Sequence, residues 1–140
     1  MAAVTADTLG AWVVRCNPRL TDPERLFADG VDNWCVARGY RSALMEPGQP
    51  VLLWITAARE RAYPRGFWGR GQLTGPVSAD DAGTLHAPMR MTLWRRPVPA
   101  AELAGVDGLA DLEVLRQPQM ANPSFVSAAQ WRRLTPLLPN

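Results

Sequence analysis

Tryptophan is the residue type in this sequence best suited to binding chemistry, and two of the six tryptophans stand beside polar or small side chains. Trp34 lies between Asn33 and Cys35, and Trp54 comes two residues before Thr56. A flipped or single-stranded base needs an aromatic pair with amide, hydroxyl and guanidinium groups nearby, because its face stacks on rings and its edge forms hydrogen bonds. Core packing is the alternative, and for any single tryptophan it is the more common role.

His86 is the only histidine, and no serine or cysteine motif stands next to it in the sequence. Nucleophilic catalysis would need Cys16 or Cys35 within hydrogen-bond reach of His86, and we expect these atoms to lie apart. The adjacent Asp80 and Asp81 are expected on a solvated loop. Two cysteines without a CxxC pair and one histidine are too few for a four-ligand zinc site. We therefore expect neither an enzyme nor a metal centre.

The composition is that of an ordinary globular domain with a mild positive charge. Its net charge of +2 permits contact with nucleic acid without requiring it. All of the basic side chains are arginine, which we attribute to a GC-rich coding genome because alanine, glycine and proline are abundant too. The sequence contains neither an apolar run of membrane-spanning length nor a signal-peptide pattern at its start. We expect a single cytoplasmic domain over residues 1–140, with reduced cysteines and no membrane partner.

Residues 66–77 (GFWGRGQLTGPV) predict a strand in which Gly69, Gly71 and Gly75 share one face with Phe67 and Leu73. Glycine weakens the interior of a strand, so three glycines on one face need a physical reason. Barrel curvature is the common reason, a β-bulge is another, and a ligand or nucleotide lying against the bare backbone is the third. A phosphate-cradling loop is disfavoured because no helix follows.

Turn and capping residues divide the rest of the chain into short elements. Asp22 and Pro23 suit the start of a helix, and Ser127 with Gln130 has the spacing of a capping box. The run at 51–56 is apolar on both faces, which predicts a central strand. Strands are predicted at residues 11–16, 51–56, 66–77 and 88–94, helices at 22–30, 97–103 and 127–135, and a short strand or extended piece at 112–115. Short strands interrupted by brief helices indicate an α+β domain around a barrel-like sheet.

Several segments follow one another in an order that matches a known family. A strand opened by Trp12 ends in a basic–small–polar–proline turn at residues 15–18 (RCNP). The other matching segments are 34–38 (WCVAR), 45–54 (MEPGQPVLLW), 66–71 (GFWGRG), 95–103 (RRPVPAAEL), 115–117 (LRQ) and 122–131 (NPSFVSAAQW). Taken together, these segments resemble EVE domains, a branch of the PUA-like superfamily, over nearly the whole chain.

The resemblance implies a PUA-like, EVE-type β-barrel of five to six mostly antiparallel strands flanked by short helices. It implies no catalytic machinery and no cofactor. Related domains bind nucleic acid, and several of them take a modified base into an aromatic pocket. The expected function is therefore that of a non-enzymatic reader, with nucleic acid as the partner.

The same resemblance implies a base-binding pocket made of Arg15, Cys16, Asn17, Trp34, Val36, Trp54, Thr56, Asn122 and Pro123. Arg15 would contact a phosphate or a base edge. Trp34 and Trp54 would stack on the base. Thr56 and Asn122 would form hydrogen bonds with it.

Three positions depart from the family pattern and support an alternative. Cys16 and Asn17 stand where serine and glutamate are commoner, and Val36 stands where a polar or aromatic residue is usual. Together with the mild charge, these differences favour a small-ligand or protein-interaction module on the same barrel, without nucleic-acid binding. An open cleft with a basic rim and with Trp34 and Trp54 lining it would favour the reader. A pocket filled by Trp34 and Trp54 would favour the interaction module.

Overall fold

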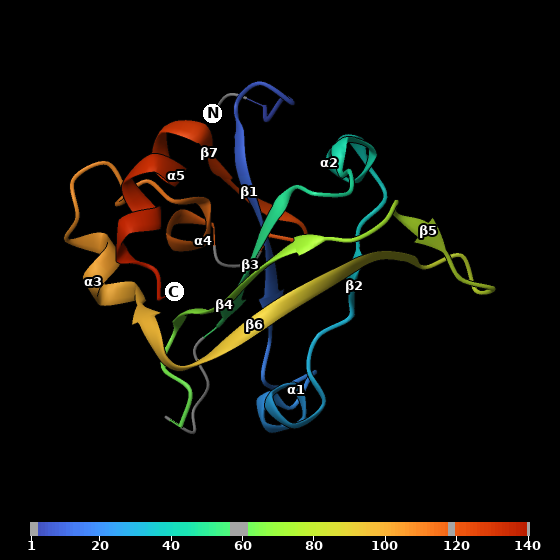
Figure 1. The fold of residues 1–140 in the computed structure, drawn as a ribbon, viewed down its shortest axis with the longest axis horizontal. Helices are drawn as coiled ribbons and strands as arrows, with labels where there is room; N and C mark the ends of the chain where they lie inside the picture. The colour runs from blue at the N-terminus through green and yellow to red at the C-terminus, as the bar shows by residue number, and fades with distance from the viewer. Residues whose placement is uncertain (1–2, 57–61, 118–119, 140) are drawn as a thin grey trace.

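The computed structural model of the chain describes residues 3–56, 62–117 and 120–139 and shows strands and short helices mixed along the sequence (Figure 1). The strands are β1 (Leu9–Cys16), β2 (Asn33–Val36), β3 (Pro50–Ile55), β4 (Gly66–Leu73), β5 (Ser78–Ala79), β6 (Leu85–Pro99) and β7 (Ser124–Ser127). The helices are α1 (Pro23–Asp29), α2 (Tyr40–Leu44), α3 (Ala100–Ala104), α4 (Glu113–Arg116) and α5 (Ala128–Leu134), and a 3₁₀ turn, Thr135–Leu137, follows. This mixture confirms the predicted α+β class.

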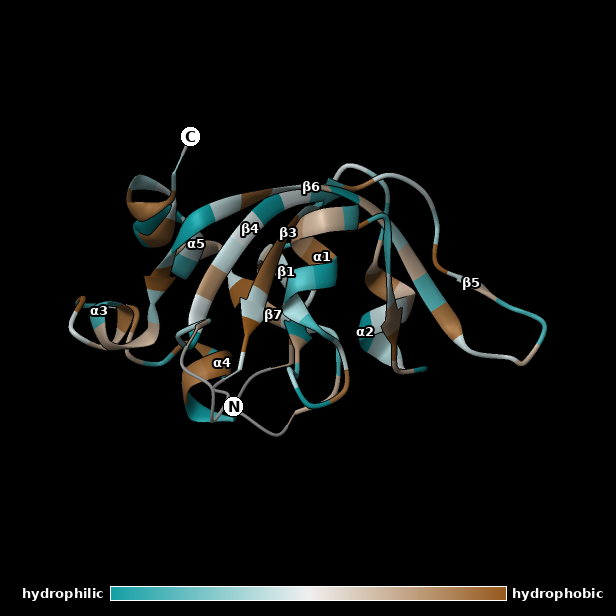
Figure 2. Cartoon of the chain, turned by 90° about the horizontal axis from the view of Figure 1, so that it is seen from below, coloured by the Kyte–Doolittle hydropathy of each residue, from teal (hydrophilic) through white to brown (hydrophobic). Residues whose placement is uncertain are grey.

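The strands form one curled sheet in the order β2-β6-β4-β3-β1-β7, and the two-residue β5 pairs with β6 (Figures 1 and 2). Strands β1 and β3 are parallel, and the other pairings among the described strands are antiparallel. The curl makes a half-barrel, which agrees with the barrel-like sheet expected from the sequence. The described strands number seven, one more than the upper expected number.

The middle of the sheet is buried on both faces, as the apolar run at 51–56 predicts. The face covered by α3, α4 and α5 carries what we call the C-terminal core, which includes Val13, Leu52, Trp54, Phe67, Leu103 and Leu134. The opposite face carries the N-terminal core, which includes Trp12, Val14, Val36, Leu53, Trp68 and Leu73. Alternate residues of β1 and β3 enter one core or the other because successive side chains of a strand point to opposite faces.

Two helix starts follow from capping chemistry. The Asp22 carboxylate accepts the backbone N–H of Glu24 at 3.0 Å, and Pro23 occupies the first turn of α1. At α5, the Ser127 hydroxyl accepts the N–H of Gln130 at 3.2 Å, and the Gln130 amide oxygen accepts the N–H of Ser127 at 3.0 Å. Both helices therefore begin where the sequence predicts.

Other predicted elements were wrong in kind or extent. Residues 112–115 belong largely to the helix α4 and not to a strand, because Leu115 and Arg116 donate backbone hydrogen bonds to Leu112. The strand expected at 88–94 extends from Leu85 to Pro99, so α3 begins only at Ala100. Helix α2 was not predicted.

The glycines of β4 allow a neighbouring strand to approach closely. A Cβ atom on Gly71 would overlap the carbonyl oxygen of Arg90 in β6. The register also shifts between Phe67 and Gly69, so Phe67 enters the C-terminal core whereas Leu73 enters the N-terminal core. The expectation that Phe67 shares a face with the glycines was therefore wrong. At Gly71 the group lying against the bare backbone is strand β6.

We expect Gly71→Ala to lower the free energy of unfolding by about 1–3 kcal/mol. The new Cβ would overlap the backbone of Arg90 and Met91 in β6, which cannot move away as a flexible side chain could. Gly39→Ala is the matched control, since a Cβ there meets nothing within 4 Å and its φ of 170° is extended backbone. Urea titrations of the two variants measure the difference. Equal midpoints would contradict a close approach of β6 at this position.

Candidate functional site

A pocket of about 840 Å³ opens where β1 and β3 end. Because these strands are parallel and Arg15 pairs with Trp54, the chain leaves both at the same edge of the sheet. The loops that follow, the helix α1 and the strand β2 supply the other walls. The described lining residues are Arg15, Asn17, Arg19, Leu20, Thr21, Leu26, Asn33, Trp34, Cys35, Trp54, Thr56, Arg65, Met120, Ala121 and Asn122.

Six of the nine residues expected in a base-binding pocket line this one: Arg15, Asn17, Trp34, Trp54, Thr56 and Asn122. The other three do not line it. Cys16 and Val36 are packed in the N-terminal core, with exposed fractions of 0% and 6%, and Pro123 is buried. Cys16 points away from Arg15 because neighbouring strand residues alternate between faces.

Trp54 reaches the pocket only as part of its floor. Its side chain is 1% exposed, and its ring meets the ring of Phe67 edge-on with the centroids 4.8 Å apart. Trp54 is therefore a core residue and does not offer the stacking face that the sequence led us to expect. Trp34 is half-buried, so its indole is the aromatic surface of the pocket.

The Asn122 side chain is used by the fold itself. Its amide oxygen accepts the backbone N–H of Arg15 at 2.8 Å, and its NH₂ group donates to the carbonyl oxygen of Arg15 at 3.2 Å. Its own carbonyl oxygen accepts the N–H of Ala37 at 2.8 Å. Asn122 thus ties the end of β1 to the residue after β2, and its amide positions Arg15 instead of being directed at a ligand.

Arg15 places a buried positive charge at the bottom of the pocket. Its guanidinium donates to the carbonyl oxygen of Met120 at 2.7 Å and to the hydroxyl of Ser124 at 2.9 Å, and the residue is 7% exposed. Its buried Nε has no acceptor among the residues that the structure describes. Burial lowers the pKa of Arg15, although the nearby Glu113 carboxylate partly opposes this. A negatively charged or carbonyl-rich ligand would offset the cost of this buried charge.

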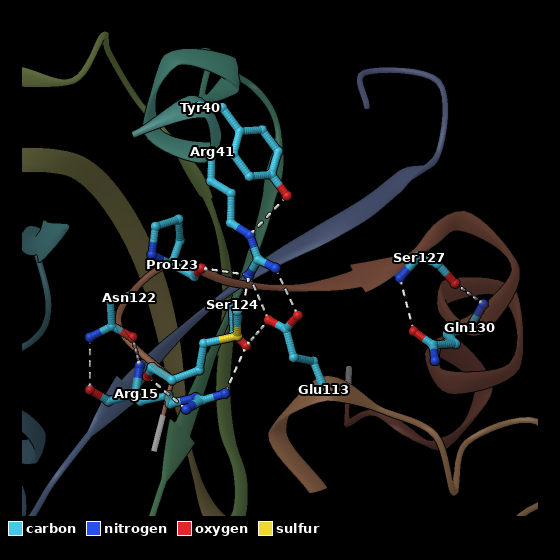
Figure 3. A network of polar contacts seen from close by, with 10 residues as sticks. Arg15, Tyr40, Arg41, Glu113, Asn122, Pro123, Ser124, Ser127 and Gln130 are labelled. Carbon is cyan, nitrogen blue, oxygen red and sulfur yellow. Dashed lines mark hydrogen bonds and ion pairs between the residues drawn. The ribbon is translucent and has the colours of Figure 1, made fainter. Parts of the chain in front are cut away.

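A chain of polar contacts holds Arg15 in place (Figure 3). Arg41 of α2 makes a two-pronged ion pair with Glu113 of α4, with N–O distances of 2.6 and 2.8 Å. The Ser124 hydroxyl donates to Glu113 at 2.5 Å and accepts from Arg15. Burial alone would raise the pKa of Glu113, but the hydrogen bonds from Arg41 and Ser124 and the two arginine charges lower it overall. Glu113 is therefore held as a carboxylate.

Sequence reasoning missed Arg41, Glu113 and Ser124. The one signal was local: Glu113 stands between the apolar residues Leu112 and Val114, both of which are buried. A carboxylate at such a position enters the interior and requires a cationic partner. The partner itself, 72 residues away, has no signature in the sequence.

The described lining of the pocket is basic. Its described lining includes three arginines, Arg15, Arg19 and Arg65, and no acidic residue. Arg19 and Arg65 are exposed, and Leu20 beside Arg19 is 84% exposed. The pocket therefore combines a half-buried indole with a basic rim, but Trp54, the second tryptophan that the sequence expectation placed in an open cleft, is buried in its floor.

The expected separation of cysteine and histidine was wrong for one cysteine. The sulfur of Cys35 lies 3.8 Å from Nδ1 of His86, whereas the sulfur of Cys16 is buried and contacts the carbonyl oxygen of Thr21 at 3.6 Å. Both cysteines are free thiols. The described residues contain no group of three or more histidine, cysteine or acidic side chains placed to hold a metal ion.

Within residues 3–56, 62–117 and 120–139, no helix combines the length and the apolarity that crossing a membrane requires.

No protein-family model matches the chain, and no curated protein matches its sequence.

Solved structures do share the fold. A hypothetical protein from Leishmania major aligns with a TM-score of 0.71 and 14% identity, over 95% of this chain and 96% of that one. A protein from Pseudomonas syringae aligns with a TM-score of 0.67 and 14% identity, over 91% and 98% of the two chains. One from Rhodopseudomonas palustris has a TM-score of 0.67 and 16% identity, over 94% and 97%. At these identities the likeness is one of fold alone.

We expect Glu113→Gln to lower the free energy of unfolding at neutral pH by about 3–5 kcal/mol, because it leaves the charges of Arg41 and Arg15 without a carboxylate. Asp111→Asn is the matched control. It removes a carboxylate from an ion pair with Arg116 whose side chains are 60% and 77% exposed, so its effect should stay within about 0.5 kcal/mol. Chemical denaturation measures both values.

The pH dependence identifies the cause of this loss. Because the pKa of Glu113 is lower in the folded than in the unfolded chain, its contribution is complete above its ordinary value of 4.5 and is lost as the pH falls through the folded value. The gap in stability between the natural chain and Glu113→Gln should therefore narrow in acid. A gap that stays constant down to acid unfolding would show that packing, and not charge, causes the loss.

Proposed function

We propose that this chain is a non-enzymatic nucleic-acid reader of the EVE type, within the PUA-like superfamily, which takes a modified base of DNA or RNA into its pocket. The observation that carries the proposal is the composition of the pocket: its described lining holds the half-buried indole of Trp34, the almost wholly buried indole of Trp54, three arginines and no acidic residue. A volume of about 840 Å³ lies within the range of small-molecule sites and accommodates a base with its sugar.

The lining residues suggest a division of roles. The half-buried Trp34 offers a ring for stacking, and stacking tolerates any base because each base has a π-face. Arg19 and Arg65, which are exposed, suit the phosphates on either side of the base. These contacts supply affinity without distinguishing one base from another.

Recognition of the base edge falls to Asn17, Thr56 and Arg15. The amide oxygen of Asn17 accepts the backbone N–H of Arg19 at 3.0 Å. The NH₂ group of Asn17 is therefore the part of the amide that would donate a hydrogen bond to a base edge. Thr56 follows β3, and its hydroxyl lies 3.4 Å from the carbonyl oxygen of Cys16. Arg15 at the floor supplies positive charge against the carbonyl groups of a base.

We expect Arg19→Gln and Arg65→Gln each to weaken binding of short oligonucleotides and to reduce the slope of log K against log salt by about 1, because each removes one phosphate contact. Arg132→Gln is the control: it removes the same charge from an exposed position on α5 that does not line the pocket. Fluorescence anisotropy at several salt concentrations measures these values. A ligand bound with no salt dependence would instead favour the small-ligand module.

We expect Trp34→Leu to weaken binding of a base-modified oligonucleotide by about 5- to 150-fold, which corresponds to the loss of about 1–3 kcal/mol of stacking. Trp131→Leu is the matched control, because Trp131, like Trp34, is half-buried against a core but does not line the pocket. Titration of both variants with the same panel of modified DNA and RNA oligonucleotides tests the role. Affinities that fall equally in both variants would exclude Trp34 as the stacking surface.

A further inference from the structure

We propose that Cys35 is a reactive thiol that is modified by small, soft electrophiles, with His86 as the base that takes its proton and Asp80 as the residue that positions His86. The proposal does not rest on the proposed function, although Asn33 and Cys35 also line the pocket. It concerns an exposed face of the sheet where β2, β5 and β6 meet.

The sheet register brings the thiol and the imidazole together. Cys35 of β2 and His86 of β6 are directly opposite each other in an antiparallel pair, so their side chains lie on the same face. The sulfur lies 3.8 Å from Nδ1 of His86. Cys35 is exposed and also lines the pocket, so a small reagent can reach it.

Asp80 determines which ring nitrogen faces the thiol. The Nε2–H of His86 donates to Oδ2 of Asp80 at 2.8 Å, since a carboxylate can only accept. The other carboxylate oxygen of Asp80 accepts the backbone N–H groups of Ala82 and Thr84 at 2.9 and 3.0 Å. The turn before β6 therefore holds the carboxylate in place and leaves Nδ1 as the ring nitrogen that faces the Cys35 sulfur and the Asn33 amide oxygen.

Asn33 stabilises the ring once it has taken the proton. Its amide oxygen lies 2.9 Å from Nδ1 of His86, and its NH₂ group donates to the Asp32 carboxylate at 2.7 Å, which sets the orientation of the amide. A protonated Nδ1 can donate to this oxygen, whereas an unprotonated Nδ1 cannot. The imidazolium is thus bonded at both nitrogens and places its positive charge beside the Cys35 sulfur.

The chemical step is an ordinary displacement. The sulfur of Cys35 transfers its proton to Nδ1 of His86, and the thiolate attacks the carbon of the electrophile. With iodoacetamide, the S–C bond forms as the C–I bond breaks, iodide leaves, and the imidazolium later releases its proton to solvent. Cys16 cannot compete, because its side chain is 0% exposed and burial, with the charge of Asp22, raises the pKa of its thiol to about 11.

The test is the rate of alkylation of the folded chain by iodoacetamide at neutral pH, with each cysteine followed by peptide mass spectrometry. Cys35 should react about 3- to 10-fold faster than the thiol of a short unstructured peptide, while Cys16 stays unmodified. Asp80→Asn and His86→Gln should each return Cys35 to about the rate of the peptide.

Asp81→Asn is the matched control, because it removes the same charge from the adjacent residue, which makes no hydrogen bond to His86 among the described contacts. Its Cys35 should keep the rate of the natural chain. Melting curves of each variant exclude unfolding as the cause of a change. The proposal fails if Cys35 in the natural chain reacts no faster than the peptide thiol, or if Asp80→Asn and Asp81→Asn change the rate equally.

Discussion

The parallel pairing of β1 with β3 is the constraint on which the pocket depends. Parallel neighbours cannot be joined by a tight turn, so the chain must travel back from the end of one strand to the beginning of the next. Residues 17–49 make this crossover and include α1, β2 and α2. The pairing therefore brings two strand ends to one edge and also sends the crossover past that edge, where Leu26 and Trp34 become walls of the pocket.

The buried polar network fixes the position of Arg15 at the edge of the sheet where β1 and β3 end. Arg41 in the crossover reaches Glu113 of α4, and Ser124 of β7 links that carboxylate to Arg15. A buried ion pair of this kind contributes little net stability compared with apolar packing, since desolvation offsets most of its attraction. Its clear effect is geometric: it holds one guanidinium at the base of a pocket whose other two arginines, among the described lining residues, are exposed.

Sequence was sufficient where one or two neighbouring residues decide the local structure. The Asp22 cap of α1, the Ser127 capping box of α5 and the central position of β3 all follow from residue type and spacing. Long-range register decides the rest. Trp54 is a core residue because Phe67 of another strand packs on its ring, and the contact of Cys35 with His86 depends on two strands separated by 51 residues. Neither relation has a local signature.

The loop at residues 17–21 contributes side chains to the pocket but to neither core. Its shape is maintained by backbone hydrogen bonds, in which the carbonyl oxygen of Asn17 accepts from the N–H groups of Leu20 and Thr21. Substitutions at Arg19 or Leu20 would thus change the rim of the pocket at little expense to folding. The rim formed by this loop is therefore open to evolutionary divergence while the sheet beneath it is retained, whereas Arg15, Trp54 and Asn122 line the pocket and also take part in the contacts that hold the fold.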